Sequence, residues 1–220
     1  MIAAIRRGPH ISAKSNDAIL SLREETHEKV KNGYAKVVTW KSIRSNPPKN
    51  LKISPVAMVP HKSRRFRTIL DLSFALKHKG SVIPSVNETT SLLAPVEAII
   101  QLGNCVERII TTIVNQYDPH RPFAFAKIDI KDGFWRMMVS QADAWNFCYV
   151  MPSTSPVDDI DEMEIVVPSS LQMVWCESPP YFCAATETAR DIIENLLSAN
   201  TPCPSHHFET KLSLIHISEP

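Results

Sequence analysis

FAFAKIDIKDGFWRMM, which runs from Phe123 to Met138, is the stretch of sequence around which the predicted fold is organised. Its first six residues alternate bulky or charged side chains with alanine and isoleucine, a period of two that predicts a β-strand. Asp129 lies at the end of this strand, and Lys131–Gly133 break the pattern as a turn does. Phe134 follows the carboxylate by five residues. This pattern indicates a site for a hard cation beside a sugar and its phosphates. Taken alone, it is also compatible with a strand-end cap at Asp129 and ordinary core packing at Phe134.

A second informative stretch, PVAMVPHKSRRFRTILDL, spans residues 55–72. Two apolar runs, 56–59 and 68–72, are separated by a short polar segment, which predicts a β-hairpin. The tip of this hairpin is basic and contains His61, Lys62, Arg64, Arg65 and Arg67. Arginine offers a bidentate fork to phosphate and lysine a point charge, so the tip is a candidate phosphate site. A solvated basic loop is the alternative interpretation.

A third stretch, LQMVWCESPP, spans residues 171–180 and predicts the start of a long helix. Ser178 is expected to be the N-cap and Pro179 the first helical residue. Apolar residues then recur at helical spacing from Phe182 to Leu197, and we expect this stripe to be core. The free amides and the dipole at the start of the helix favour anionic ligands.

The composition is that of a globular chain of 220 residues with 44% hydrophobic and 21% charged residues. The net charge of +1 gives no overall attraction to nucleic acid or membrane, so any such attraction must be local. Five cysteines without a CxxC pair favour reduced thiols inside a cell, with cytoplasm and nucleus not distinguished. The sequence shows no signal peptide and no apolar run long enough for a membrane helix.

The other predicted elements are weaker signals. They are a helix over 15–32, a strand over 34–40, a loop over 74–87, a helix over 92–103, an apolar segment of open state over 106–114, a strand over 145–151, an acidic hairpin loop over 153–164 and a return strand from 165. The tail from 200 to 220 is predicted to be unstructured, and its ending LSLIHISEP resembles a translated cloning or sequencing adaptor.

The order of these stretches resembles a reverse transcriptase of the retroelement type, close to the RNA-directed DNA polymerases of LTR-type elements. KIDIKDGFW resembles the first catalytic palm motif, RFRTILDLS the fingers strand that contacts the triphosphate, and LQMVWCESPPYF the motif that begins the helix behind the incoming nucleotide. The resemblance covers residues 52–197 approximately. It implies an α/β (α+β) fold with polymerase fingers and a partial palm, an antiparallel sheet backed by helices.

The resemblance also implies a division of the chain and a chemistry. Residues 1–50 would form an N-terminal helix and connector, 51–122 a fingers-like region and 123–199 a partial palm. The family transfers nucleotides with two Mg²⁺ ions, one of which activates the primer 3′-hydroxyl while both stabilise charge on the phosphate. Asp129 is then the catalytic ligand of both ions, and the main-chain carbonyl of Ile130 is a further ligand.

Five further residues correspond by this resemblance to nucleotide contacts. Phe134 matches the aromatic that packs under the sugar and excludes a 2′-hydroxyl, while Lys62 and Arg67 match the residues that neutralise the triphosphate. Met173 lies where the family usually has glutamine near the sugar, and Ser178 begins the helix near the template. The implied partners are an RNA or DNA template with its primer and deoxynucleoside triphosphates, without a membrane.

Two departures from the family pattern are visible. Val174 replaces the glycine that precedes the tryptophan of the helix-entry motif, which puts the nucleotide fit in doubt. After Leu197 there is no Tyr-x-Asp-Asp sequence, and Asp158-Asp159 comes before the helix instead. One carboxylate cannot hold two divalent ions, so we expect little or no polymerase activity from these 220 residues. The alternatives are a nucleic-acid-binding module without catalysis and a degenerate fragment of a mobile element.

Overall fold

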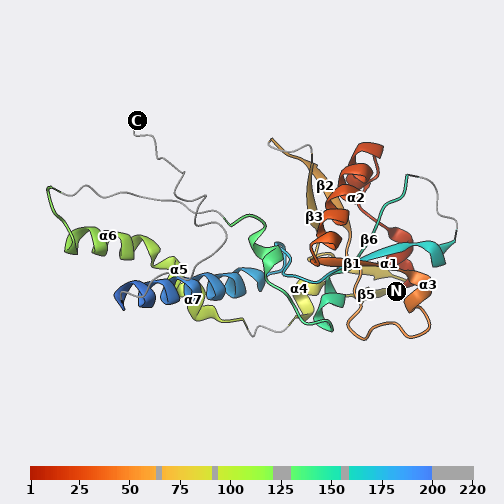
Figure 1. The fold of residues 1–220 in the computed structure, drawn as a ribbon. Coiled ribbons are helices and arrows are strands. Elements are labelled where there is room, and N and C mark those ends of the chain that lie inside the picture. The colour runs from red at the N-terminus through yellow and green to blue at the C-terminus, as the bar shows by residue number, and fades with distance from the viewer. Residues whose placement is uncertain (63–65, 91–93, 121–129, 155–158, 200–220) are drawn as a thin grey trace.

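The computed structural model describes residues 1–62, 66–90, 94–120, 130–154 and 159–199, and these form a mixed fold of helices and small antiparallel sheets. Figure 1 shows the elements in chain order. The α-helices are α1 (Ile2–Arg7), α2 (Asn16–Lys31), α3 (Trp40–Ile43), α4 (Val86–Thr89), α5 (Val96–Gly103), α6 (Cys105–Asn115) and α7 (Ser178–Ser198). The strands are β1 (Ala35–Thr39), β2 (Val56–Pro60), β3 (Phe66–Leu70), β4 (Leu76–His78), β5 (Ser81–Ile83), β6 (Tyr149–Val150) and β7 (Glu164–Pro168). The 3₁₀ helices are η1 (Ile11–Ala13), η2 (Gly133–Arg136), η3 (Asp143–Phe147) and η4 (Ile160–Glu162).

The largest sheet joins segments that are far apart in the sequence. Its order is β1-β7-β6, with both pairs antiparallel. Val37 pairs with Val166, and Val166 pairs on its other side with Tyr149. The strand predicted over 34–40 and the return strand predicted from 165 are both confirmed. The strand predicted over 145–151 is wrong in its first half, where residues 143–147 form η3 and only Tyr149–Val150 join the ladder. The central strand predicted over 123–128 lies outside the described residues.

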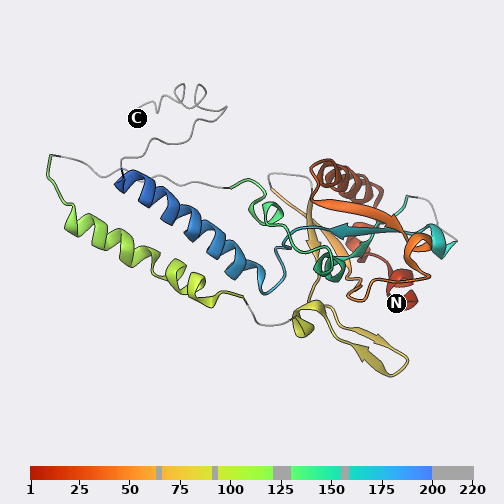
Figure 2. The ribbon, with the colours of Figure 1, turned by 60° about the horizontal axis from the view of Figure 1, so that its bottom comes forward.

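The hairpin predicted from residues 55–72 is present. β2 and β3 pair antiparallel, from Val56 opposite Leu70 to Pro60 opposite Phe66. A second hairpin, β4–β5, lies where the sequence predicted a loop. Lys79 and Gly80 have φ angles of 48° and 78°, which is the left-handed backbone that a two-residue hairpin turn requires. The turn signal was therefore correct, but strands of three residues are too short to give a readable alternation. Figure 2 shows this hairpin projecting from the rest of the chain.

Capping residues determine where two of the helices begin. The Ser15 hydroxyl accepts from the Ala18 amide at 3.3 Å and caps α2, which confirms the helix predicted over 15–32. α7 instead has Glu177 as its N-cap, so the predicted cap at Ser178 is wrong by one residue. The acidic loop before β7 contains η4, where the Asp159 side chain accepts from the Asp161 amide.

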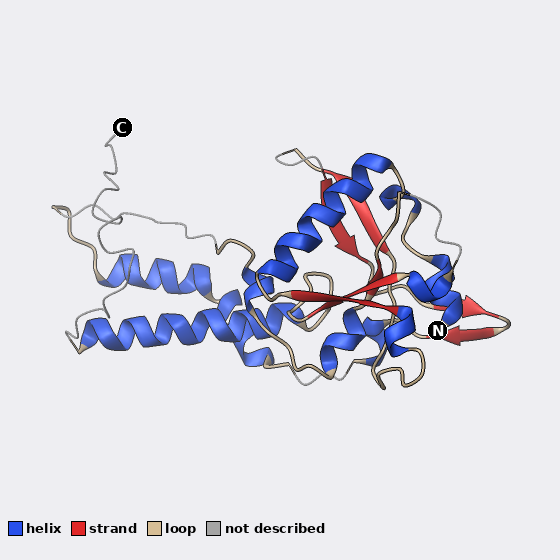
Figure 3. Cartoon of the chain, turned by 45° about the vertical axis from the view of Figure 1, so that its right-hand side comes forward, coloured by secondary structure: helices blue, strands red, loops and turns tan. Residues whose placement is uncertain are grey.

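Two clusters of buried apolar side chains form one body. The first cluster contains Leu22 of α2, Met58 of β2 and Val166 of β7, each at most 1% exposed. The second contains Ile5 of α1 and Ile165 of β7, both fully buried. Residues from the predicted regions 1–50, 51–122 and 123–199 thus share a core. Figure 3 shows the strands of this body with α2 lying beside the β2–β3 hairpin.

Helices α5, α6 and α7 form an arm that extends from the body, and α5 lies against α7 (Figures 1 and 2). The segment over 106–114, whose secondary structure the sequence left open, is helical. The apolar stripe of α7 was predicted to be core, but Ile192, Ile193 and Leu197 are between 55% and 67% exposed. The prediction is wrong for this half of the helix because the described residues leave these three side chains largely uncovered. No helix in the described ranges is long and apolar enough to cross a membrane.

Candidate functional site

The basic hairpin approaches the loop that precedes α7. Arg67 of β3 donates from Nη2 to the thioether sulfur of Met173 at 3.1 Å, across 106 residues of sequence. A thioether is a weak acceptor, so this guanidinium retains most of its capacity for an anionic partner. Lys62 is exposed at the hairpin tip, and Arg64 and Arg65 lie outside the described residues. The fold thus brings two of the predicted site residues, Arg67 and Met173, into contact.

The middle of the hairpin is fixed to helix α2. The Thr68 hydroxyl donates to Glu25 at 2.6 Å, and Glu25 also pairs with Lys29. The ammonium of Lys29 in turn lies 3.6 Å from the centre of the Trp135 ring. This chain of contacts connects the strand that carries Arg67, through α2, to the turn at residues 131–136. The relative position of the two predicted motifs is therefore set by α2.

The turn KDGFW is shaped by one left-handed residue and one close contact. Asp132 has a φ angle of 55°, which asparagine and aspartate tolerate better than most residues. A Cβ atom on Gly133 would lie 2.7 Å from the Phe182 ring, so glycine lets α7 approach the turn. Phe134 packs on the same ring with the centroids 4.9 Å apart. Phe134 is half-buried, and its ring packs against Phe182 of α7.

The predicted metal ligands are only partly described. Asp129 lies outside the described residues, whereas Ile130 is exposed and its carbonyl accepts from the Gly133 amide at 3.1 Å. A carbonyl oxygen has two lone pairs, so one remains for a cation. The described part of the chain contains no group of three or more His, Cys, Asp or Glu side chains arranged to hold a metal ion.

The loop from Leu171 to Glu177 is held mainly by its tryptophan. The Trp175 ring stacks on Tyr181 with centroids 5.9 Å apart and meets Phe147 edge-on at 5.4 Å. Its indole Nε1 donates to the Thr90 hydroxyl at 3.0 Å. Met173 is 54% exposed and Val174 is 39% exposed, so two neighbours of the anchored ring face solvent. Val174 is not among the non-glycine residues with positive φ in the described ranges, so its side chain strains no backbone here.

Ser178 has an internal role in this arrangement. The residue is fully buried, and its hydroxyl donates to the Gln172 carbonyl at 2.6 Å. The Glu177 carboxylate accepts from the Ala94 amide at 3.3 Å. Both side chains close the loop on itself and on the segment before α5. A ligand therefore has no access to the Ser178 hydroxyl, which differs from the predicted contact.

Asn87 of α4 is the functional candidate that sequence reasoning missed, because residues 74–87 were predicted to be a loop. Its side chain bonds to Val174 and Cys176 on both sides of Trp175. The signal that would have located α4 is Ser85-x-x-Glu88, the sequence of a capping box. The box is formed: Ser85 accepts from the Glu88 amide at 3.3 Å, and Glu88 accepts from the Ser85 amide at 2.7 Å.

Electrostatics adds a second connection at the same small helix. The hydrogen bond from the Ser85 amide, with the Ser85 hydroxyl and nearby Lys52, holds the pKa of Glu88 below its usual value of 4.5. Burial lowers the pKa of Lys52, and Glu88 partly opposes that shift. The Lys52 ammonium also donates to the Ser85 carbonyl at 3.1 Å. The start of the hairpin segment is thereby tied to α4.

The residues that the fold brings together form two groups. Arg67, Met173 and the Asn87-held loop make one group, and the turn at 131–136 with Phe182 makes the other. α2 and α7 connect them.

Compared with known proteins, the chain matches no protein-family model and no curated protein.

Proposed function

We propose that this chain is part of a reverse transcriptase, an RNA-directed DNA polymerase of a mobile element. The fold would then consist of polymerase fingers and a partial palm. The observation that carries the proposal is the contact between Arg67 and Met173 at 3.1 Å. The resemblance of the sequence assigns these two residues to one nucleotide site, although they belong to different motifs. A chance likeness of separate motifs gives no reason for them to meet.

The charge and exposure of the hairpin also support the proposal. Lys62 is exposed and Arg67 has only a weak thioether partner, so both cations remain able to bind the triphosphate. Phe134 would pack beneath the sugar, and its contact with Phe182 would support the ring from behind. Asp129 and the Ile130 carbonyl would hold Mg²⁺, which supplies charge stabilisation on the transferred phosphate when bound. Ser178 would act indirectly, by fixing the loop.

The test is binding of an RNA template with a dideoxy-terminated DNA primer. We expect affinity to fall as salt rises. For Lys62→Ala or Arg67→Ala, the slope of log K against log salt should become shallower by about one, because one phosphate contact is lost. The deoxynucleoside triphosphate that matches the next template base should strengthen the complex, whereas a mismatched one should not. Asp129→Asn should remove that strengthening. Asn146→Ala is the control, since the Asn146 side-chain amide donates to the Asp143 carbonyl within η3, away from both groups of the candidate site.

Other outcomes identify other functions. Salt-dependent binding that responds to Lys62 and Arg67 but ignores both the triphosphate and Asp129→Asn indicates a nucleic-acid-binding module, and it refutes the polymerase proposal. Absence of binding favours a degenerate fragment. A primer with a free 3′-hydroxyl and Mg²⁺ adds a separate measurement. Because only Asp129 among the family's catalytic carboxylates is present in these 220 residues, we expect little or no extension. Robust synthesis abolished by Asp129→Asn would contradict that expectation.

A further inference from the structure

One asparagine side chain links three separate segments of the body. Asn87 donates from Nδ2 to the Ser73 hydroxyl at 2.9 Å and to the Val174 carbonyl at 3.1 Å. Its Oδ1 accepts from the Cys176 amide at 3.1 Å. Its own main-chain amide donates to the Leu72 carbonyl at 3.0 Å. The segment after β3 and the loop before α7 therefore meet at this residue.

The partners determine which way the side-chain amide points. A carbonyl faces Nδ2 and a main-chain N–H faces Oδ1, so the opposite orientation would break both bonds at once. The bonds also fix the main chain on both sides of Trp175. The indole itself is held by Thr90, the residue that ends α4. α4 and its C-cap thus hold both the main chain and the ring of the loop.

The held loop faces the basic hairpin. Met173 precedes the clamped segment and receives the Arg67 guanidinium. Leu72 and Ser73, which bond to Asn87, follow the strand that carries Arg67. Asn87 therefore determines the distance between the two sides of the candidate site. Without it, the Val174 carbonyl and the Cys176 amide would turn to water, and the loop would move relative to β3.

We propose that Asn87 is a positioning residue for the incoming nucleotide: it holds the 173–176 loop at the distance from Arg67 at which both sides contact the same nucleotide, the loop at its sugar and Arg67 at its triphosphate. This inference rests on the proposed function. Asn87 itself does not contact the reacting atoms. Its effect is to keep the loop in place before the nucleotide arrives, so that binding does not have to order it.

The experiment measures dATP binding to the chain on an RNA template with a dideoxy-terminated DNA primer, with uracil as the next template base. We expect Asn87→Ala to weaken dATP binding by about tenfold, the effect of losing the two hydrogen bonds to the loop, and to leave template–primer affinity within about twofold. Hydrogen exchange should accelerate at the Cys176 amide. Asn146→Ala should change neither measurement, and an unchanged urea midpoint excludes general unfolding.

Asn87→Asp separates the two loop bonds. An aspartate still accepts from the Cys176 amide but places an oxygen against the Val174 carbonyl. We expect Cys176 to remain protected while dATP binding stays weak. If the wild-type chain binds dATP and Asn87→Ala binds it equally well, the inference is overturned and the proposed function stands. If the wild-type chain binds no dATP on this template–primer, the proposed function fails, and this inference fails with it.

Discussion

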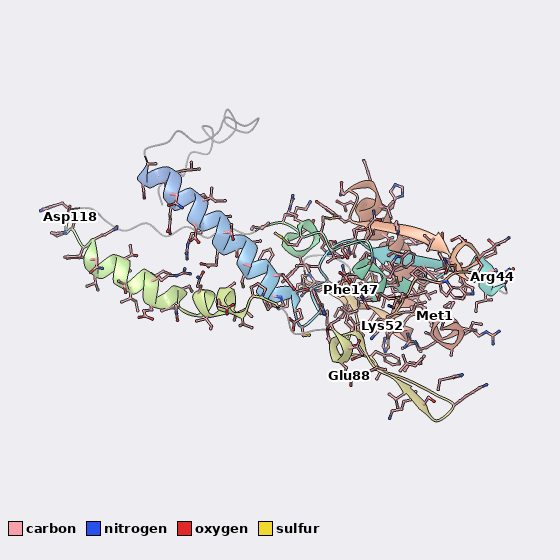
Figure 4. All side chains as sticks on the ribbon, turned by 90° about the horizontal axis from the view of Figure 1, so that it is seen from below. Met1, Arg44, Lys52, Glu88, Asp118 and Phe147 are labelled. Atoms are coloured by element: carbon pink, nitrogen blue, oxygen red, sulfur yellow. The ribbon has the colours of Figure 1, made fainter. Side chains whose placement is uncertain are left out.

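The body and the arm differ in how their apolar residues are used. In the body, Leu22, Val56 and Leu72 are fully buried among strands and helices that are distant in sequence. In the arm, α6 has no buried residue, and Ile110 and Val114 are 56% and 69% exposed. Figure 4 shows this separation, with Phe147 inside the body and Asp118 at the far end of the arm. An apolar pattern thus becomes a core only where other segments cover it.

The largest test of this difference compares two truncations to alanine. Leu22→Ala should lower the free energy of unfolding by about 3 kcal/mol, because it removes a fully buried side chain and leaves a cavity. Ile110→Ala should change it by less than about 0.5 kcal/mol, because the side chain is already 56% exposed. Urea unfolding of both variants gives the comparison. Equal losses would show that α6 is covered in solution.

A second test concerns the ion pairs that hold the arm together. Glu187 of α7 is only 8% exposed and accepts from Arg108 of α6 at 2.9 and 3.3 Å. It also accepts from Arg190 at 2.5 Å. Glu187→Gln should weaken the protection of α6 amides by about 1–2 kcal/mol, a value reduced for the partial exposure of Arg108.

The control for that test is a neighbouring carboxylate on the same helix. Glu194 is 66% exposed and lies 3.5 Å from Arg190, so Glu194→Gln should have little effect on α6. Amide hydrogen exchange resolves α6 from the body, whose protection should be unchanged in both variants. Loss of protection in the body as well would mean that the arm and the body unfold together.

A third test examines where the arm joins the body. Gly133→Ala places a Cβ 2.7 Å from the Phe182 ring and should cost about 1 kcal/mol, since the ring must shift. In a Phe182→Ala background the same change should cost almost nothing. A double-mutant cycle followed by urea unfolding measures the coupling between the two residues. Equal costs in both backgrounds would mean that the turn does not pack on α7.

The smallest expected effect is a pH dependence at α4. The pKa of Glu88 is lower when folded than its usual value of 4.5, so its contribution to stability is complete above that value. The contribution is lost as the pH falls through the folded pKa. The stability advantage of wild type over Glu88→Gln should therefore shrink between pH 6 and pH 3, measured as the difference in urea midpoints. A constant difference would contradict the capping role of the carboxylate.

Local signals predicted the elements whose cause lies within a few residues. The helix over 15–32, the hairpin of residues 55–72 and the helical spacing after Pro179 all depend on near neighbours, and each is present. The prediction missed α4 and the β4–β5 hairpin, because elements of three or four residues give too little periodicity to read. The residues that position the candidate loop, above all Asn87, were missed for the same reason.

The sequence by itself determined the type and order of the longer elements, among them α2, the β2–β3 hairpin and α7, and it suggested a set of residues for a nucleotide site. It also placed Arg67 and Met173 in two motifs that resemble the same protein family. Only the tertiary structure decided that their side chains meet and that Ser178 turns inward. Tertiary contacts also decided that the α7 stripe beyond the body stays exposed. The physical reason is that helix and strand periods are local properties, whereas burial and hydrogen-bond partnership depend on which distant segments arrive at the same place.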